Sequence, residues 1–209
     1  DAHLPYTSHD ADELVEACRA VLAHVGEGDA LALSCFWHSL LPLDEHERPL
    51  SQLLTWRDVT GAPPDLDPEA YHRRTGCFLH PSFWPAKLGG LAAARYVSFA
   101  DYLLLRLTGE LVTSVSMASG TGIFDPNRLA WDDETLAAVG VRPVQLPPVS
   151  DEQVAAVWPA LGDGACSNVG SGCVGRGRAA VITVQGAATG LQAARGTFTP
   201  LATSTTAFS

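Results

Sequence analysis

Aromatic and polar side chains directly follow two short apolar segments, residues 30–36 and 50–55. In chain order they are Trp37, His38 and Ser39 after the first segment, and Trp56, Arg57 and Asp58 after the second. An indole can pack against the C–H face of a polyhydroxylated ligand, while polar groups bind its hydroxyls. Ligands of open α/β sheets bind at the carboxyl ends of strands, so both groups are candidates for such a site. Plain core packing is an equal alternative for the tryptophans, and a partly buried structural histidine is the alternative for His38.

Several familiar catalytic patterns fail on this sequence. Residues 170–175 match G-x-G-x-x-G, but no predicted strand directly precedes them and no acidic residue follows to bind a ribose hydroxyl. The chain contains no G-x-x-x-x-G-K-[ST] phosphate loop, no H-E-x-x-H zinc motif and no G-x-S-x-G nucleophile elbow. These patterns therefore indicate neither a dinucleotide-binding enzyme nor a P-loop nucleotidase, a zinc protease or a serine hydrolase.

The elements that would position the candidate residues begin with a helix over residues 10–25. Asp10 can cap its first turn together with Glu13, and an apolar stripe at helical spacing is expected to face the core. The stripe comprises Leu14, Val15, Cys18, Val21, Leu22 and Val25. Gly26 should end this helix, and residues 30–36 then predict a fully buried parallel strand. A helix that leads into such a strand is typical of a layered α/β fold.

Local patterns further along the chain predict more helices and strands. Ser98 and Asp101 should cap a helix that ends at Gly109. The other expected elements are a hairpin over residues 41–55, a loop over residues 60–70, a helix over residues 131–139 and a buried strand over residues 179–184. The alternation of helices and strands again favours the α/β class.

The composition is that of a globular protein of ordinary polarity. The 209 residues are 46% hydrophobic and 17% charged, enough for one sizeable core or for one domain with part of another. The net charge of −10 opposes nonspecific attraction to nucleic acid and to anionic membranes, so neither is expected as a partner. No apolar run is long enough to span a membrane, and no secretory signal is visible. The five cysteines form no C-x-x-C pair, which predicts reduced thiols in a cytoplasmic protein.

Several short motifs resemble the FGGY family of carbohydrate kinases, in their wording and in their order along the chain. They are Trp37-His38 after an apolar strand, residues 53–58 (Leu-Leu-Thr-Trp-Arg-Asp), residues 74–77 (Arg-Thr-Gly-Cys), residues 84–88 (Trp-Pro-Ala-Lys-Leu), residues 107–110 (Leu-Thr-Gly-Glu) and residues 162–165 (Gly-Asp-Gly-Ala). Residues 34–40 and 162–173 resemble gluconate kinases in particular. Each motif is weak alone, but their joint order, within residues 6–184, is specific.

The resemblance implies an α/β fold of the actin-like, ribonuclease-H-like type, with a mixed sheet flanked by helices. It implies a sugar-binding N-terminal lobe over residues 1–184. Residues 185–209 would be a divergent remnant at the start of the ATP-binding lobe. The implied cofactors are ATP and Mg²⁺, with Gly186 and Thr189 at the position of the phosphate-binding turn.

The resemblance also assigns roles to the candidate residues. By similarity, Trp37 and His38 form the sugar-contact pair and Trp56 takes the stacking position. Asp58 and Ser82 are further substrate-binding positions, and Ser82 falls where some relatives have a substrate-contacting tyrosine. The implied ligand is therefore a sugar or a sugar acid.

Asp163 takes the position of the catalytic base and of a metal ligand in this resemblance. Its carboxylate could accept the proton of a substrate hydroxyl as that oxygen attacks the γ-phosphorus of ATP. Gly162 and Gly164 would leave room for the approaching substrate. The alternative is that Asp163 merely caps the helix that follows, and both roles can coexist. The kinase hypothesis expects Asp163 in a cleft beside the indoles of Trp37 and Trp56.

The sequence departs from the family pattern at the phosphate-binding segments. No Asp-x-Gly-Thr loop is present, most of the second lobe is missing, and residues 184–191 differ from the Gly-Thr-Ser-Gly turn of relatives. Phosphoryl transfer depends on positioning and electrostatic stabilisation, so we expect little or no kinase activity from the chain alone. The leading hypothesis is a gluconate- or sugar-acid-type kinase, whole or in part. The alternative is a non-catalytic sugar-binding or dimerising module, with a homodimer or the missing second lobe as partner.

Overall fold

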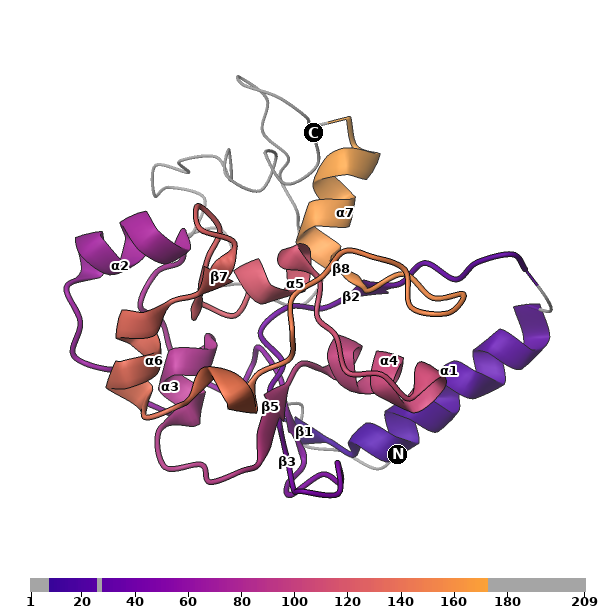
Figure 1. Cartoon of the computed structure of the whole chain (residues 1–209), viewed down its shortest axis with the longest axis horizontal. Helices are drawn as coiled ribbons and strands as arrows, with labels where there is room; N and C mark the ends of the chain where they lie inside the picture. The colour runs from indigo at the N-terminus through magenta and orange to yellow at the C-terminus, as the bar shows by residue number, and fades with distance from the viewer. Residues whose placement is uncertain (1–7, 26–27, 173–209) are drawn as a thin grey trace.

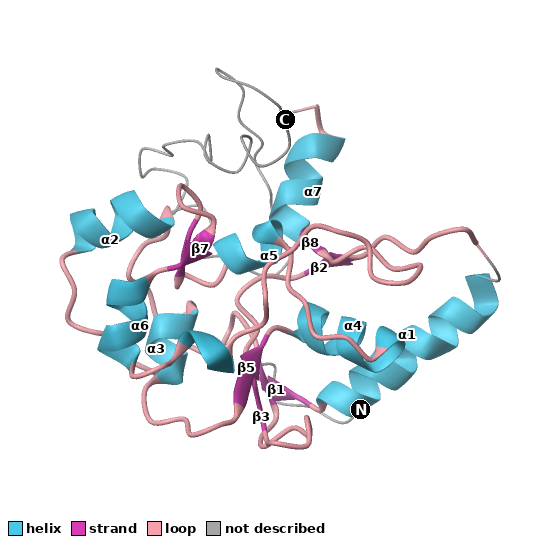
Figure 2. Cartoon of the chain, in the orientation of Figure 1, coloured by secondary structure: helices cyan, strands magenta, loops and turns pink. Residues whose placement is uncertain are grey.

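The computed structural model of the chain describes residues 8–25 and 28–172, in which short strands and helices alternate (Figure 1, Figure 2). The helices are α1 (Ala11–Val25), α2 (Pro68–Thr75), α3 (Trp84–Leu88), α4 (Phe99–Thr108), α5 (Val115–Ser119), α6 (Asp133–Val139) and α7 (Asp163–Gly170), with a short 3-10 helix η1 (Pro143–Gln145). The strands are β1 (Ser8–His9), β2 (Ser34–Cys35), β3 (Leu41–Leu43), β4 (Leu53–Leu54), β5 (Arg95–Val97), β6 (Phe124–Asp125), β7 (Ala130–Trp131) and β8 (Leu161–Gly162). The strand expected over residues 179–184 lies outside the described residues.

Three of the four strand pairs within the described ranges connect segments that are far apart in the sequence, and the fourth, β6–β7, joins neighbouring segments. β2 pairs in parallel with β8, whereas β1–β4, β3–β5 and β6–β7 are antiparallel. In Figure 1, α1 and α4 lie at one end of the molecule, and α2, α3 and α6 gather at the other. Parallel and antiparallel pairs flanked by helices agree with the predicted mixed α/β class.

Two clusters of buried side chains stabilise these two ends. The first contains Ala11, Val15, Leu41, Leu43, Leu53, Val97, Phe99, Tyr102, Leu103 and Leu105. The second contains Leu40, Trp84, Leu88, Tyr96, Ile123, Leu136, Val141 and Leu146. Successive side chains of a strand point to opposite faces, so the neighbours Tyr96 and Val97 of β5 belong to different clusters. The β3–β5 pair therefore lies between the two cores.

The segment over residues 30–36 is parallel to its partner, as predicted, but it is not fully buried. Ala32 and Ser34 are exposed, whereas the alternate side chains Leu33 and Cys35 pack partly against the cores. This alternation means that only one face of the strand is covered by the described residues. The expectation of burial on both faces was therefore wrong.

The hairpin expected over residues 41–55 forms only in part. The carboxylate of Asp44 accepts hydrogen bonds from two backbone N–H groups of the turn, at 2.8 and 2.9 Å. The two arms share only single bridges, because the full pairing of β3 is with β5 and that of β4 is with β1. In the next segment, α2 begins at Pro68, inside the predicted loop.

Helix α1 begins where the sequence predicts. The Asp10 carboxylate accepts hydrogen bonds from two backbone N–H groups of the first turn, at 2.9 and 3.1 Å. Val15 is buried, but Val21 is 62% exposed and Val25 is 76% exposed. These two residues of the expected apolar stripe are thus uncovered, because α4 has 10 residues against the 15 of α1 and cannot cover its whole length. Gly26 lies outside the described residues.

Helix α4 is capped as predicted. The Ser98 hydroxyl accepts a hydrogen bond from the backbone N–H of Asp101 at 3.2 Å, and the Asp101 carboxylate accepts one from the N–H of Ser98 at 2.8 Å. Gly109 ends the helix with a φ of 81°, a conformation that favours glycine. The third predicted helix is α6, which begins later than expected because Trp131 pairs within β7.

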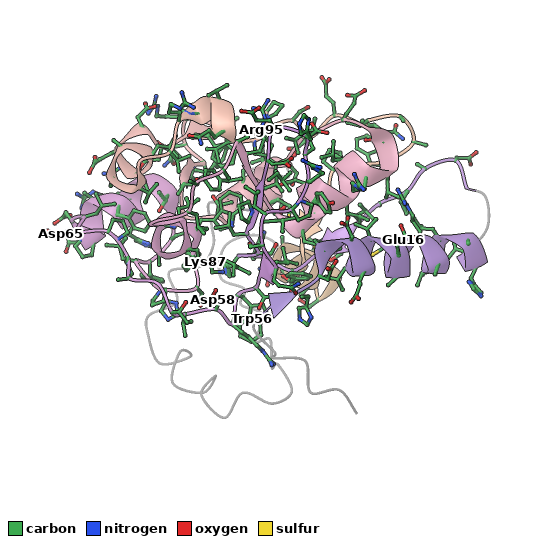
Figure 3. The ribbon with its side chains drawn as sticks, turned by 90° about the horizontal axis from the view of Figure 1, so that it is seen from below. Glu16, Trp56, Asp58, Asp65, Lys87 and Arg95 are labelled. Carbon is green, nitrogen blue, oxygen red and sulfur yellow. The ribbon has the colours of Figure 1, made fainter. Side chains whose placement is uncertain are left out.

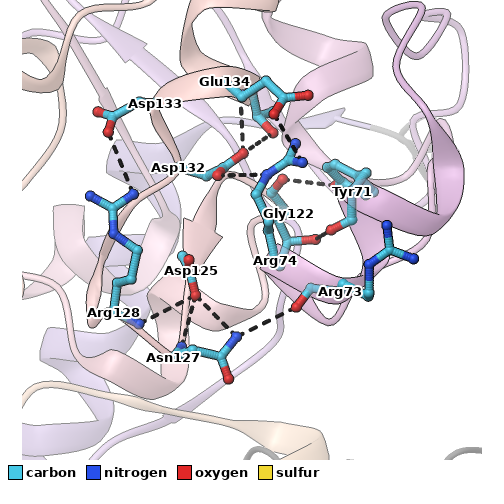
Figure 4. Close-up of polar contacts among 12 residues, drawn as sticks. Tyr71, Arg73, Arg74, Gly122, Asp125, Asn127, Arg128, Asp132, Asp133 and Glu134 are labelled. Carbon is cyan, nitrogen blue, oxygen red and sulfur yellow. Dashed lines mark hydrogen bonds and ion pairs between the residues drawn. The ribbon is translucent and has the colours of Figure 1, made fainter.

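A cluster of charged side chains holds α2 against the start of α6 (Figure 4). The guanidinium of Arg74 donates to the carboxylate of Asp132 at 3.0 Å and forms an ion pair with Glu134 at 3.0 Å. Asp132 is 1% exposed and also caps α6 by accepting a hydrogen bond from the N–H of Thr135 at 3.0 Å. Charge-assisted hydrogen bonds therefore fix the relative position of the two helices.

The thiols within the described residues are free, as predicted. They are Cys18, Cys35, Cys77 and Cys166. Burial raises the pKa of Cys35 and that of Cys77 to about 12, so neither thiol is a reactive nucleophile near pH 7. None of the helices in residues 8–25 and 28–172 combines the length and the apolar character needed to cross a membrane.

Candidate functional site

The parallel pair of β2 and β8 brings the ends of two strands to one edge. Cys35, the last residue of β2, is paired with Gly162, the last residue of β8. Asp163 directly follows β8, and Trp37 follows β2 after one residue, so both lie at the same edge. Asp163 is the first residue of α7, is exposed, and accepts a hydrogen bond from the backbone N–H of Gly164 at 2.8 Å. Its position is compatible with both predicted roles, a helix-terminal anion and a proton acceptor at the carboxyl end of a strand.

The indole of Trp37 fills a space lined by three glycines. A Cβ atom on Gly120 or Gly162 would overlap the indole, and one on Gly164 would lie 2.8 Å from its Cζ3 atom. The indole Nε1–H donates to the backbone carbonyl of Ser116 at 3.1 Å. Gly162 and Gly164 therefore make room for Trp37, and the expectation that they leave space for substrate was wrong.

Asp163 lies beside one of the two expected indoles and is not enclosed. The glycines on either side of it approach Trp37, while the aspartate itself is exposed. In Figure 1, the first turn of α7 lies next to β8, and the rest of the helix extends away from the described chain. The expectation of a carboxylate inside a cleft was thus wrong for the described residues.

His38 is held in an uncommon backbone conformation. Its φ is 66°, in the left-handed region that residues other than glycine rarely adopt. Its Nδ1 atom lies 2.6 Å from the carbonyl oxygen of Gly120, and its ring centroid lies 4.2 Å from that of Phe83. A carbonyl oxygen only accepts, so Nδ1 carries the proton and Nε2 is the acceptor. Burial lowers the pKa of His38 to about 4, so the ring is neutral near pH 7.

The burial of His38 predicts a loss of stability in acid. An unfolded histidine has a pKa near 6.5, whereas that of folded His38 is about 4. Its neutral form stabilises the fold fully above the unfolded pKa, and this contribution is lost as the pH falls toward 4. The shift corresponds to about 3 kcal/mol. Urea unfolding between pH 7 and pH 4 should therefore show a smaller loss of unfolding free energy for His38→Gln than for the wild type.

The comparison of the two pH profiles isolates this effect. Packing lost in His38→Gln shifts its profile by a constant amount, which does not change the slope. Other titrating groups, such as the buried Asp101 with a pKa raised by burial to about 6, contribute equally to both proteins. Parallel profiles would contradict the assignment of a buried neutral ring to His38.

Trp56 and Asp58 follow β4, and Figure 3 shows both on the same side of the molecule as Lys87. Trp56 is 39% exposed, and the guanidinium of Arg57 lies 4.9 Å from the centroid of its ring. The Asp58 carboxylate accepts hydrogen bonds from the backbone N–H of Thr60 at 3.1 Å and from its hydroxyl at 2.7 Å. An exposed indole is suited to the stacking role, while Asp58 shapes the turn after it.

Ser82 lies beside the contact between Phe83 and His38. It is half-buried, and its backbone N–H donates to the ring of His80 at 3.1 Å. Its neighbour Phe83 meets the His38 ring edge-on. Ser82 therefore directly precedes a residue that contacts His38 of the sugar-contact pair. Its role in substrate binding stays a prediction.

Lys87 was not among the predicted site residues. It is 6% exposed, and its Nζ donates hydrogen bonds to the carbonyl oxygens of His38 at 2.5 Å and Thr55 at 2.7 Å. Burial lowers the pKa of Lys87 to about 8, and the charge of Asp58 acts in the opposite direction. A cation inside the otherwise apolar helix α3 is the sequence signal that could have identified it.

The structure brings together residues from four separate segments. Trp37 contacts the glycines that flank Asp163, and Lys87 connects the backbone of His38 to the residue that precedes Trp56. The other predicted positions, Gly186 and Thr189, lie outside the described residues.

The described part of the chain contains no metal site built from protein side chains alone. No group of three or more His, Cys, Asp or Glu side chains there could hold a metal ion. Mg²⁺ is commonly bound by one or two carboxylates together with the phosphates of a nucleotide. The single exposed carboxylate of Asp163 fits this mode of binding only when a nucleotide supplies the remaining ligands.

Comparisons with known proteins agree with the order of the motifs. The profile of the FGGY family of carbohydrate kinases, N-terminal domain, matches residues 85–168. A gluconokinase of Bacillus subtilis is 28% identical over 131 residues, covering 56% of this chain and 26% of that protein. A xylulose kinase of Streptomyces rubiginosus is 34% identical over 154 residues, covering 66% of this chain and 32% of that protein. The region over residues 85–168 belongs to the FGGY family.

A solved structure supports the fold of this chain. The gluconate kinase of Lactobacillus acidophilus matches 83% of the chain with a TM-score of 0.69 and 22% identity, over 43% of that kinase. At this identity the likeness shows the fold, and it confirms the predicted actin-like, ribonuclease-H-like α/β class. The chain spans no more than about a third of the two curated relatives described above. The predicted domain boundary at residue 184 stays a prediction, because residues 173–209 lie outside the described ranges.

Proposed function

We propose that this chain is the sugar-binding part of an ATP-dependent carbohydrate kinase that acts on gluconate or a related sugar acid. The pairing of β2 with β8 carries the proposal, because it puts Asp163 beside the segment of Trp37 and His38. A carboxylate next to a polyol site is what phosphoryl transfer to a hydroxyl requires.

In the proposed reaction, a sugar hydroxyl attacks the γ-phosphorus of ATP. The hydroxyl proton passes to the Asp163 carboxylate as the new O–P bond forms and the bond to ADP breaks. Asp163 is exposed, so a bound sugar can reach it. Mg²⁺, held by Asp163 and the phosphates, would offset the negative charge of the phosphates.

The proposed sugar site has one fixed wall and one open face. Trp37, fixed between glycines, forms the wall, and the exposed indole of Trp56 packs against the C–H face of the sugar. Neutral His38 accepts a hydrogen bond from a sugar hydroxyl through Nε2. Asp58 and Ser82 are the further polar positions proposed to bind hydroxyls.

Gluconate is the proposed substrate because relatives named gluconokinase match the chain and because residues 34–40 and 162–173 resemble that group. Xylulose is the main competitor, since a relative of 34% identity is a xylulose kinase. A glycerol kinase of Xanthobacter autotrophicus also matches, at 30% identity. Titration with all three compounds distinguishes these substrates.

We expect the 209-residue chain alone to have little or no kinase activity. It spans 26% and 32% of the two relatives, and within its described residues Asp163, through Mg²⁺, is the one proposed link to the phosphates. The alternative is a non-catalytic sugar-binding module. The exposure of Asp163 is consistent with this alternative, because the carboxylate is not enclosed in a cleft. A cytoplasmic location, a homodimer or second-lobe partner, and the absence of nucleic-acid and membrane partners stay predictions.

Calorimetry and tryptophan fluorescence test the proposal. Gluconate should bind the chain and change its tryptophan fluorescence, and a coupled assay with MgATP and gluconate should give little or no turnover. Sugar binding without ATP binding would favour the non-catalytic module. Absence of any response to gluconate, xylulose and glycerol would contradict the proposed sugar site, and ordinary kinase rates would contradict the expected inactivity.

A further inference from the structure

A buried ammonium group lies between the two segments that carry the proposed sugar contacts. Lys87 is 6% exposed and has buried neighbours, Ala86 and Leu88, on either side in α3. Removing a charged group from water is strongly unfavourable unless hydrogen bonds compensate for the lost hydration. The partners of Lys87 therefore indicate which parts of the fold it holds.

Both hydrogen-bond acceptors of Lys87 are backbone carbonyls from different segments. One is the carbonyl of His38, after β2, and the other is that of Thr55, after β4. The two segments share the bridge Leu40–Leu54, and Lys87 joins them just beyond this bridge, on the side of the aromatic residues. The ammonium group thus connects the backbone of the two segments where strand pairing has ended.

Each of the two carbonyls belongs to a residue with a special local geometry. His38 has a φ of 66°, which persists in a protein only where surrounding contacts hold it. The carbonyl of Thr55 also accepts a hydrogen bond from the backbone N–H of Asp58 at 3.0 Å, which closes the turn that contains Trp56. By binding both carbonyls, Lys87 fixes the strained residue and the turn relative to each other.

Two titratable groups near Lys87, Asp58 and His38, come from the same two segments. The negative charge of Asp58, after β4, favours the ammonium form. The ring of His38, after β2, is neutral near pH 7, and Lys87 and His80 both oppose its protonation. The other residues of α3 (Trp84, Pro85, Ala86 and Leu88) carry no charge.

We propose that Lys87 is a positioning residue of the sugar site, which sets the spacing of the His38 and Trp56 segments without contacting the sugar. The effect on sugar binding rests on the proposed function, whereas the link between the segments rests on the hydrogen bonds alone. Lys87→Met tests both, because methionine keeps a long unbranched side chain and loses the charge and the donors.

The affinity for gluconate should fall at least about tenfold in Lys87→Met, and the urea midpoint should also fall, because the carbonyls of His38 and Thr55 lose a hydrogen-bond donor. Trp84→Phe is the matched control. It removes another buried donor of α3, the indole N–H that binds the carbonyl of Ser39 at 2.7 Å. This control should lower the midpoint and leave the gluconate affinity within about twofold.

The pH dependence of binding separates positioning from general stability. Lys87 loses its proton above a pKa of about 8, so the wild-type affinity for gluconate should weaken between pH 7 and pH 9. Lys87→Met should show no such change. Amide hydrogen exchange supplies a measurement without sugar: the Asp58 amide should exchange faster in Lys87→Met, relative to the Gly109 amide of α4 as the internal reference.

The outcomes distinguish the two proposals. If the wild type binds gluconate and Lys87→Met binds it equally well, the positioning role is overturned and the proposed function stands. If the wild type binds no sugar, the proposed function fails. Hydrogen exchange of the Asp58 amide then tests by itself whether Lys87 links the two segments. Unchanged exchange would then overturn the link between the segments, and faster exchange would support it.

Discussion

Gly162→Ala is expected to destabilise the chain by about 3 kcal/mol, near the upper end of what overpacking usually costs. A Cβ at this position would overlap the Trp37 ring. The indole cannot simply move aside, because it also packs against Gly120 and Gly164 and donates to the carbonyl of Ser116. Either the ring leaves its site or β8 shifts away from β2, and both changes disturb the proposed sugar site.

Urea unfolding measures this loss, and Gly170→Ala is the matched control. Gly170 ends the same helix that Gly162 precedes, and a Cβ there meets no atom within 4 Å. Alanine is the better helix former, so the control should be as stable as the wild type or slightly more so. Adding Trp37→Leu to Gly162→Ala should recover part of the lost stability, since the clash is between these two positions. Equal stability of the Gly162→Ala and Gly170→Ala proteins would contradict the packing.

Helix ends were predictable from the sequence because their signals are local. The Ser98–Asp101 capping box and the glycine at position 109 define α4 within one turn of each end. Asp10 likewise begins α1. These hydrogen bonds join residues a few positions apart, so the order of residues alone specifies them.

Strand pairing and burial were harder to predict because both depend on distant segments. The sequence of β4 does not show that its partner is β1 and not β3. The exposure of Val21 and Val25 depends on how far α4 reaches along α1, which the apolar stripe of α1 cannot show. Long-range contacts decide these features, and periodicity within one segment carries no information about them.

The candidate site was predictable in its residue types but not in its packing. The order of the motifs placed Trp37 and His38 after a strand and Asp163 at the start of a helix, and the structure agrees. The glycine cradle of Trp37 and the double hydrogen bond of Lys87 join residues more than 30 positions apart. A motif gives such residues a place in the chain, whereas only the fold shows which of them touch.

Asp163→Asn is expected to lower phosphoryl transfer by about 10²–10⁴-fold while leaving the gluconate affinity within about twofold. A general base contributes about this factor, and an amide cannot take the proton of the attacking hydroxyl. The asparagine oxygen can still accept the hydrogen bond from the N–H of Gly164, so the helix end is retained. Loss of the charge at the start of α7 should lower the unfolding free energy by less than about 1 kcal/mol.

Single-turnover transfer of labelled phosphate from MgATP to gluconate, with protein in excess, detects rates far below those of ordinary kinases. Asp151→Asn is the matched control, because Asp151 is also exposed and also accepts a hydrogen bond from a backbone N–H at a helix start, that of Val115 at 2.9 Å. It should alter neither transfer nor affinity. If Asp163→Asn reduced the sugar affinity as much as the transfer, Asp163 would be a structural cap, because a base acts on the transition state and not on the bound sugar.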